Sequence, residues 1–188
     1  MSDKTNRIVI LNGASGAGKT LLCRALQDVL SEPYIHLEED RFVYGTYHPK
    51  YLQPGSGEEI FRKTMLGYYR SIRAFADSGH HVLMDTGFYS LDFLKTCVAE
   101  LQGYPVWLVG VHCSLEELER REAARGDRQA GLAREQFETI HAHLTYDVSV
   151  DTTARDSDEC AAEIAAVVES GLPAHAMSAL GPWLLAES

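Results

Sequence analysis

The segment IVILNGASGAGKTLLCRALQDVL, residues 8–30, decides how the rest of the chain folds. Its first four residues, Ile8 to Leu11, are apolar without polar alternation, which is typical of a strand buried on both faces of a parallel sheet. From Lys19 to Leu30 the apolar residues recur at helical spacing, and Ser31-Glu32-Pro33 ends the pattern. The segment therefore predicts a strand, a glycine-rich loop and a helix in succession.

The glycine-rich loop has the spacing of a phosphate-binding loop, GxxxxGK followed by Thr. Its residues are Gly13, Ala14, Ser15, Gly16, Ala17, Gly18, Lys19 and Thr20. In such a loop the glycines let backbone N–H groups curl around phosphates, and the helix N-terminus adds the positive end of its dipole. We expect Lys19 to reach the β- and γ-phosphates of ATP and the Thr20 hydroxyl to ligate Mg²⁺. The alternative is a glycine turn with a solvated lysine.

The rest of the chain alternates short apolar runs with helical patterns. Strands are predicted at residues 34–37, 81–84, 106–111 and 148–150, and helices at 58–77, 91–101, from Ser114 onward and at 157–169. This order predicts a three-layer α/β fold with a mainly parallel sheet, whose ligands lie beyond the carboxyl ends of the strands. We expect one domain over residues 1–170, with an acceptor region near 40–70 and a lid near 120–134. Residues 171–188 fit no repeating pattern and are expected to be a packed tail or a partner contact.

Composition excludes several classes of protein. The chain has 188 residues and a formal net charge of −10, which opposes binding to nucleic acid or to an anionic membrane because phosphates must be met by clustered Lys or Arg. The first apolar run is too short for a signal peptide or a membrane span, so we expect a cytoplasmic protein. The four cysteines show no disulfide or zinc-ligand spacing, and we expect reduced, mostly buried thiols; the eight histidines show no ligand spacing, and we assign them no role.

Two carboxylates follow predicted strands and are candidates for chemistry. Asp85 ends the third strand, where a protein with a phosphate-binding loop commonly holds Mg²⁺, although Asp is also a common turn or cap residue. Asp40 follows the second strand, where a carboxylate can accept the proton of an acceptor hydroxyl. Its neighbours Glu38 and Glu39 leave the choice of base open on pattern alone, and a solvated acidic turn is the alternative.

A cluster of basic residues supplies the positive charge that the acidic chain otherwise lacks. It consists of Arg120, Arg121, Arg125, Arg128 and Arg134. Guanidinium groups on a lid can neutralise a phosphoryl group in transfer, and we favour this role for Arg125 and Arg128. Interleaved acidic residues favour helix-surface pairing for Arg120 and Arg134.

Aromatic residues gather in the predicted acceptor region. They are Phe42, Tyr44, Tyr47, Tyr51, Phe61, Tyr68 and Tyr69. They could wall an acceptor pocket, and ordinary packing of a loop and a helix explains them equally well.

The order of these motifs resembles the chloramphenicol phosphotransferase family. The resemblance covers roughly residues 7–168 and is carried by the glycine-rich loop together with Glu32-Pro33, Asp40, Asp85, Val109-Gly110-Val111, Cys113, Ala124-Arg125-Gly126-Asp127-Arg128, Gly131, Tyr146-Asp147-Val148, Val150-Asp151-Thr152-Thr153 and Glu159-Cys160-Ala161. It implies an ATP-dependent 3-O-phosphotransferase with a fold akin to nucleotide kinases and a role in antibiotic resistance. It also implies that Asp40 is the general base.

Three features depart from the family pattern. The family often has a second Asp directly after the strand-three Asp, and this chain has Thr86 there. Residues 41–70 show little likeness to the family's acceptor region, and residues 171–188 extend beyond it. We therefore expect an enzyme that transfers phosphate from ATP to a small-molecule hydroxyl, with chloramphenicol as one candidate acceptor. A nucleoside or nucleotide kinase and a non-catalytic nucleotide-binding regulator are the rival functions, whereas the absence of an NKxD motif disfavours a GTPase.

Overall fold

A sheet of parallel strands forms the centre of the molecule. The computed structural model describes residues 5–45, 57–125, 131–142 and 144–186. The strands are β1 (Ile8–Asn12), β2 (Tyr34–Glu38), β3 (His81–Thr86), β4 (Val106–His112) and β5 (Val148–Asp151). In the described part of the chain their order is β2-β3-β1-β4-β5 and every neighbouring pair is parallel, which confirms the expected α/β fold.

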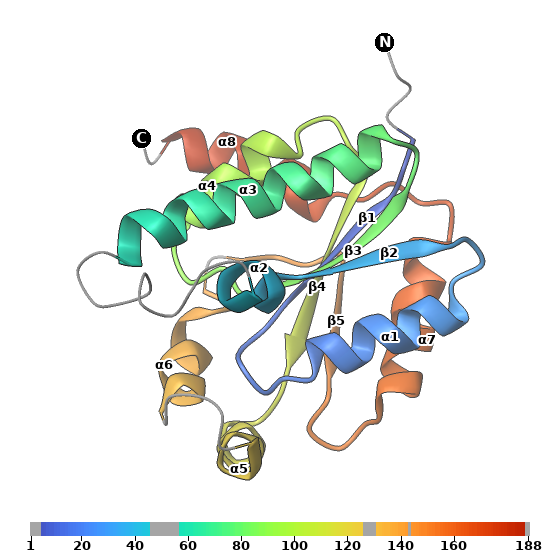
Figure 1. Cartoon of the computed structure of the whole chain (residues 1–188). Helices are drawn as coiled ribbons and strands as arrows, with labels where there is room; N and C mark the ends of the chain where they lie inside the picture. Colours follow the sequence, from blue (N-terminus) through green and yellow to red (C-terminus); the bar gives the residue numbers. More distant parts are fainter. Residues whose placement is uncertain (1–4, 46–56, 126–130, 143, 187–188) are drawn as a thin grey trace.

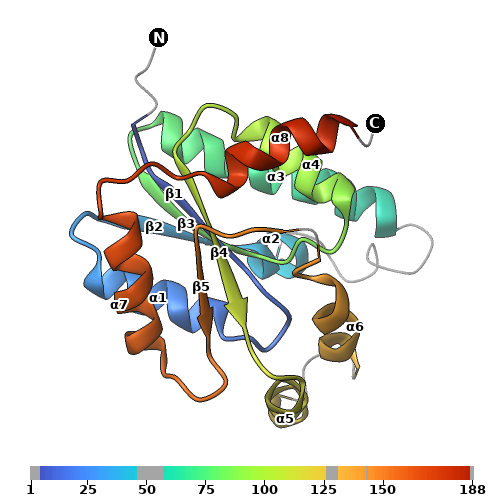
Figure 2. The ribbon, with the colours of Figure 1, turned by 180° about the vertical axis from the view of Figure 1, so that it is seen from behind.

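Helices cover both faces of this sheet, as Figures 1 and 2 show. One face carries α1 (Lys19–Val29) and α7 (Ser157–Val168), and the other carries α3 (Gly57–Asp77) and α4 (Leu91–Glu100). Strand β1 is buried along its whole length and its side chains alternate between the two cores. Val9 and Leu11 join one cluster of buried residues, whereas Ile8 and Ile10 join the other. None of the described helices combines the length and hydropathy needed to cross a membrane.

Three further helices lie around the carboxyl ends of the strands (Figure 1). They are α2 (Glu39–Gly45), α5 (Leu115–Arg125) and α6 (Leu132–Thr139). Of the acidic run, for which a solvated turn is the alternative interpretation, Glu38 ends β2, and Glu39 and Asp40 form the first turn of α2. Asp40 therefore sits on a helix that begins where β2 ends.

The C-terminal segment contains a helix that we did not predict. Helix α8 (Ala176–Ala186) packs against β4 and α4, and its Met177, Leu180 and Leu184 are buried in the second core. Gly181-Pro182 lies inside this helix, and both residue types have low helix propensity, so local sequence gave no helical signal. The buried apolar contacts of α8 outweigh this propensity.

The first glycine of the phosphate-binding loop is required by close packing. A Cβ atom on Gly13 would lie 2.5 Å from the carbonyl oxygen of Val111 and 3.2 Å from the Val111 Cβ. We expect Gly13→Ala to destabilise the protein by about 1–3 kcal/mol, because backbone on β4 would have to move. The free energy of urea unfolding measures this effect.

Gly67 provides the matched control for this substitution. It lies on the exposed side of α3, and a Cβ there meets nothing within 4 Å. Gly67→Ala should stabilise the protein by roughly 0.5–1 kcal/mol, since alanine loses less backbone entropy in a helix. Equal destabilisation by both substitutions would contradict the steric argument.

Candidate active site

The loop between β1 and α1 has the geometry of an anion-binding site. Gly16 and Gly18 have positive φ angles of 84° and 86°, and the Ala17 N–H donates to the Ala14 carbonyl at 3.1 Å. Gly18 is the N-cap of α1, and no described side chain caps this helix. The Nζ of Lys19 donates to the Gly13 carbonyl at 2.6 Å and to the Ala14 carbonyl at 3.0 Å. The N-terminus of a helix, with its dipole, and an ammonium group thus meet at one glycine-rich loop.

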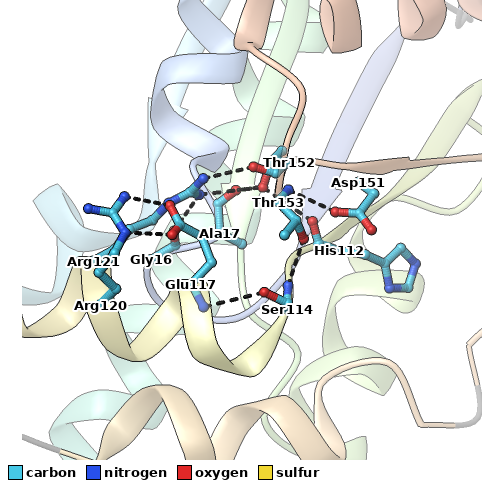
Figure 3. Close-up of polar contacts among 10 residues, drawn as sticks. All are labelled: Gly16, Ala17, His112, Ser114, Glu117, Arg120, Arg121, Asp151, Thr152 and Thr153. Carbon is cyan, nitrogen blue, oxygen red and sulfur yellow. Dashed lines mark hydrogen bonds and ion pairs between the residues drawn. The ribbon is translucent and has the colours of Figure 1, made fainter.

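Residues far away in the sequence hold this loop in place. Arg121 Nη1 donates to the Gly16 carbonyl at 3.1 Å, and Thr152 Oγ1 donates to the Ala17 carbonyl at 2.9 Å. Figure 3 shows Arg121 and Thr152 approaching the loop from α5 and from the segment after β5. On α6, the buried Gln136 accepts a hydrogen bond from the Ser15 N–H at 2.6 Å.

Arg121 belongs to the predicted arginine cluster, and the sequence indicates no particular role for it. Its Nη2 donates to the Thr152 carbonyl at 2.7 Å, and its Nε is 2.7 Å from the Glu117 carboxylate (Figure 3). Thr152 belongs to one of the motifs that carry the family resemblance, and its contacts join that motif to the phosphate-binding loop. No signal in the sequence pointed to Gln136.

Two other arginines of the cluster, Arg120 and Arg134, form the helix-surface ion pairs that the sequence predicts. Arg120 pairs with Glu117 at 2.6 Å and Arg134 pairs with Glu119 at 2.7 Å. The side chain of Arg125 and the whole of Arg128 lie outside the described residues, so the lid role favoured for them stays a prediction.

Asp85 lies beside Thr20, the other residue predicted to ligate Mg²⁺. Its Oδ2 accepts a hydrogen bond from Thr20 Oγ1 at 2.7 Å, and its Oδ1 accepts one from the Glu39 N–H at 3.3 Å. Burial raises the pKa of Asp85, but His36, Thr20 and Lys19 favour the charged form and leave its pKa below the ordinary value. An ionised carboxylate beside a hydroxyl is a donor pair that suits Mg²⁺.

Glu39 is a buried carboxylate that pattern alone could not distinguish from its neighbours. It accepts hydrogen bonds from Thr86 Oγ1 and, at 3.2 Å, from the Gly87 N–H. Burial raises the pKa of Glu39 to about 7, although both hydrogen bonds act against the rise. Thr86 stands where the family often has a second Asp, so a carboxylate reaches this position from the start of α2 instead.

A single cavity of about 820 Å³ connects these groups, and its size is typical of a small-molecule site. Asp40 is half-buried and lines one end of it. That end is acidic and is lined by Glu38, Glu39, Asp40, Asp85, Thr86 and Tyr89. The loop residues Ser15, Gly16, Gly18, Lys19 and Thr20 line it between the two ends, since Thr20 contacts Asp85 and Gly16 contacts Arg121. Arg120, Arg121, Thr152, Arg155, Asp156 and Ser157 line the other end.

Most of the aromatic residues of the predicted acceptor region pack in the core rather than line the cavity. Tyr68 and Tyr69 are fully buried, and Tyr68 Oη donates to the carbonyls of Leu37 and Asp85 at 2.8 and 2.9 Å. Phe42 and Phe61 pack against the same core, and Tyr44 is exposed. Tyr47 and Tyr51 lie outside the described residues. The aromatic ring that does line the cavity is Tyr89, which sequence reasoning missed.

The fold is shared with many small-molecule kinases. The Mycobacterium tuberculosis APS kinase CysC in complex with AMPPNP and APS superposes with a TM-score of 0.67 at 18% identity, covering 89% of this chain and 99% of the kinase. The tunicamycin resistance protein of Deinococcus radiodurans gives a TM-score of 0.67 at 16% identity, with coverages of 90% and 99%. At these identities the similarity shows the fold alone.

Sequence comparison gives a closer relationship. A Mycobacterium tuberculosis protein named "Putative O-phosphotransferase" is 34% identical over 180 residues, covering 84% of this chain and 80% of the relative. The family model described as chloramphenicol phosphotransferase-like protein matches residues 6–169. Most of the chain, including the loop, Asp40, Asp85 and the segment around Thr152, lies within this match. The chain is thus a member of the chloramphenicol phosphotransferase-like family.

Proposed function

We propose that this protein transfers the γ-phosphoryl group of ATP, bound with Mg²⁺, to a hydroxyl group of a small molecule. The observation that carries the proposal is the cavity, which Lys19, Thr20, Asp85 and Asp40 all line. The family relationship supports the reaction type, since the relatives carry the name "Putative O-phosphotransferase". An antibiotic such as chloramphenicol, and with it a role in antibiotic resistance, is the first acceptor to test.

The two ends of the cavity suggest how the substrates are oriented. The phosphates of ATP would bind the loop between β1 and α1, with Lys19 at the β- and γ-phosphates. Because the candidate base Asp40 lines the acidic end, the acceptor would enter there. The nucleoside would then extend toward the other end, past Arg121 and Thr152.

Thr20 and Asp85 are the residues that would hold Mg²⁺, which neutralises phosphate charge when bound. Asp40 would accept the proton of the acceptor hydroxyl as the new O–P bond forms. Because the transition state of phosphoryl transfer is loose, the proton leaves late, and much of the effect of Asp40 would be to orient the hydroxyl. Lys19 would stabilise the charge that develops on the leaving phosphate.

The acidic end of the cavity bears on the identity of the acceptor. Four carboxylate residues line it, namely Glu38, Glu39, Asp40 and Asp85, and the nearby cations that line the cavity are Lys19 of the loop and Arg24, which lies 3.9 Å from Glu38. An acceptor that carries a phosphate or carboxylate would be repelled by this lining. A neutral acceptor is therefore favoured, which suits a phenicol or a nucleoside better than a nucleotide.

A panel of acceptors tests the proposed function. ATP consumption is measured with chloramphenicol, other hydroxylated antibiotics, neutral nucleosides and nucleoside monophosphates, and the products are checked by mass for an added phosphoryl group. We expect a phosphorylated product from a neutral acceptor and none from a monophosphate. Tight ATP binding without any product would favour the nucleotide-binding regulator, whereas efficient use of a monophosphate would favour the nucleotide kinase.

A further inference from the structure

Three side chains of metal-ligating type, from three different elements, meet beside Thr20. Cys23 comes from α1, His36 from β2 and Asp85 from the end of β3. The ligand atoms of these residues lie within 4.8 Å of one another. The three residues are too far apart in the sequence to form a recognisable motif. The packing of α1 on the parallel sheet brings them together.

His36 contributes a ring nitrogen that has no hydrogen-bond partner among the described residues. The side chain is 8% exposed, and its buried Nε2 atom lies 3.4 Å from Asp85 Oδ2, close enough for an ion pair but outside the geometry of a hydrogen bond. A buried polar atom without a partner is uncommon in native proteins and calls for an explanation. A bound cation between the imidazole and the carboxylate would provide one.

Cys23 provides the third ligand and a soft one. Its thiol is fully buried, and burial, together with the charge of Asp85, raises its pKa well above the ordinary value. In the absence of a metal the group is therefore a neutral thiol. Metal binding would form an S–metal bond and release the thiol proton to solvent.

The donor set distinguishes between metal ions. Mg²⁺ takes oxygen ligands in octahedral geometry, whereas sulfur, imidazole nitrogen and carboxylate oxygen suit Zn²⁺ in a tetrahedral site. One thiolate and one carboxylate balance the charge of Zn²⁺, so the complex would be neutral, as a buried site requires. A tetrahedral site places its ligand atoms roughly 3.3–3.8 Å apart, so side-chain shifts of about 1 Å would close the cluster.

We propose that Cys23, His36 and Asp85 form a binding site for Zn²⁺ with a fourth, open coordination position. Asp85 belongs to this site and also to the pair with Thr20. Zn²⁺ at the site takes the Asp85 carboxylate away from Thr20 and so weakens Mg²⁺-dependent nucleotide binding. This last consequence rests on the proposed function, whereas the metal site itself does not.

Cobalt serves as a spectroscopic probe of the site, because Co²⁺ occupies zinc sites and gives a charge-transfer band when a thiolate binds it. We expect the wild-type protein to show this band and Zn²⁺ to displace Co²⁺ from it. Cys23→Ser should abolish the band, and His36→Gln should weaken Zn²⁺ affinity by about 10-fold or more. Near-unchanged thermal unfolding would show that the variants are folded.

Cys97→Ser is the matched control, since Cys97 is equally buried but lies in the other core cluster. It should keep the cobalt band. Absence of the band from the wild-type protein, or its persistence in Cys23→Ser, would overturn the proposal and leave His36 as a residue that orients Asp85. Loss of the band in Cys97→Ser but not in Cys23→Ser would overturn it as well.

The consequence for nucleotide binding is measured separately. Titration of MgATP in the presence of Zn²⁺ should show weakened binding in the wild-type protein and little change in Cys23→Ser. If the cobalt and zinc experiments succeed but the protein transfers no phosphate to any acceptor, the proposed function fails while the metal site stands. If the protein transfers phosphate but shows no cobalt band, the metal site fails while the proposed function stands.

Discussion

Lys19→Ala should leave a folded protein that transfers phosphate about 10³-fold more slowly than the wild type, or not at all. The Nζ of Lys19 lies at the phosphate-binding loop, 2.6 Å from the Gly13 carbonyl, and is the ammonium group of the motif. Its charge stabilises the phosphate oxygens more strongly as charge develops on them, so the loss falls mainly on turnover. Single-turnover transfer to an accepted substrate measures the effect.

Lys63→Ala is the control for this substitution. Lys63 is an exposed residue of α3 that pairs with Glu59 at 3.2 Å, and a surface pair of this kind contributes little to stability. We expect wild-type turnover from Lys63→Ala. Wild-type turnover from Lys19→Ala would remove the loop from the reaction.

Asp40→Asn should lower kcat by about 10²-fold or more with ATP affinity nearly unchanged. The substitution keeps the size and one acceptor oxygen of the side chain but cannot take a proton. Asp40 lines the acidic end of the cavity in the first turn of α2. Asp92→Asn is the matched control, because Asp92 also lies in the first turn of a helix, α4. We expect this variant to have the kcat of the wild type.

The neighbouring carboxylates have different expected signatures. Asp85→Asn should weaken MgATP binding, because it removes the charged partner of Thr20. Glu39→Gln should affect stability and site geometry together, since the Glu39 carboxylate accepts from Thr86 and Gly87. Normal turnover by Asp40→Asn combined with inactivity of Glu38→Gln or Glu39→Gln would transfer the base role to that neighbour.

Local patterns predicted most of the fold. The strands around Ile10, Leu83 and Leu108 are buried on both faces, so each gave a short apolar run that could be recognised without its neighbours. The first helix was equally clear, because it follows the glycine loop and carries a periodic apolar face. Helix α8 could not be predicted, since its stability comes from contacts with β4 and α4 rather than from propensity.

The sequence likewise predicts some residues of the candidate site and not others. Lys19, Thr20 and Asp85 could be placed because each stands next to a strand or a loop of defined geometry, and parallel strands bring their carboxyl ends to one edge. Gln136 and the burial of Glu39 could not be foreseen, since hydrogen bonds between distant segments leave no trace in local composition. For the same reason, the sequence does not show that Cys23 and His36 lie close together.

The long-range hydrogen bonds that anchor the phosphate-binding loop affect how the protein folds during its synthesis on the ribosome. The loop lies near the N-terminus, but its hydrogen bonds to Arg121, Gln136 and Thr152 span 105, 121 and 135 residues. Contacts of such separation form only after most of the chain has been synthesised, because the entropy of closing these long loops must be met first. A nascent chain therefore carries the complete phosphate-binding motif long before the loop is held in its final shape, and the proposed binding of ATP would become possible only late in folding.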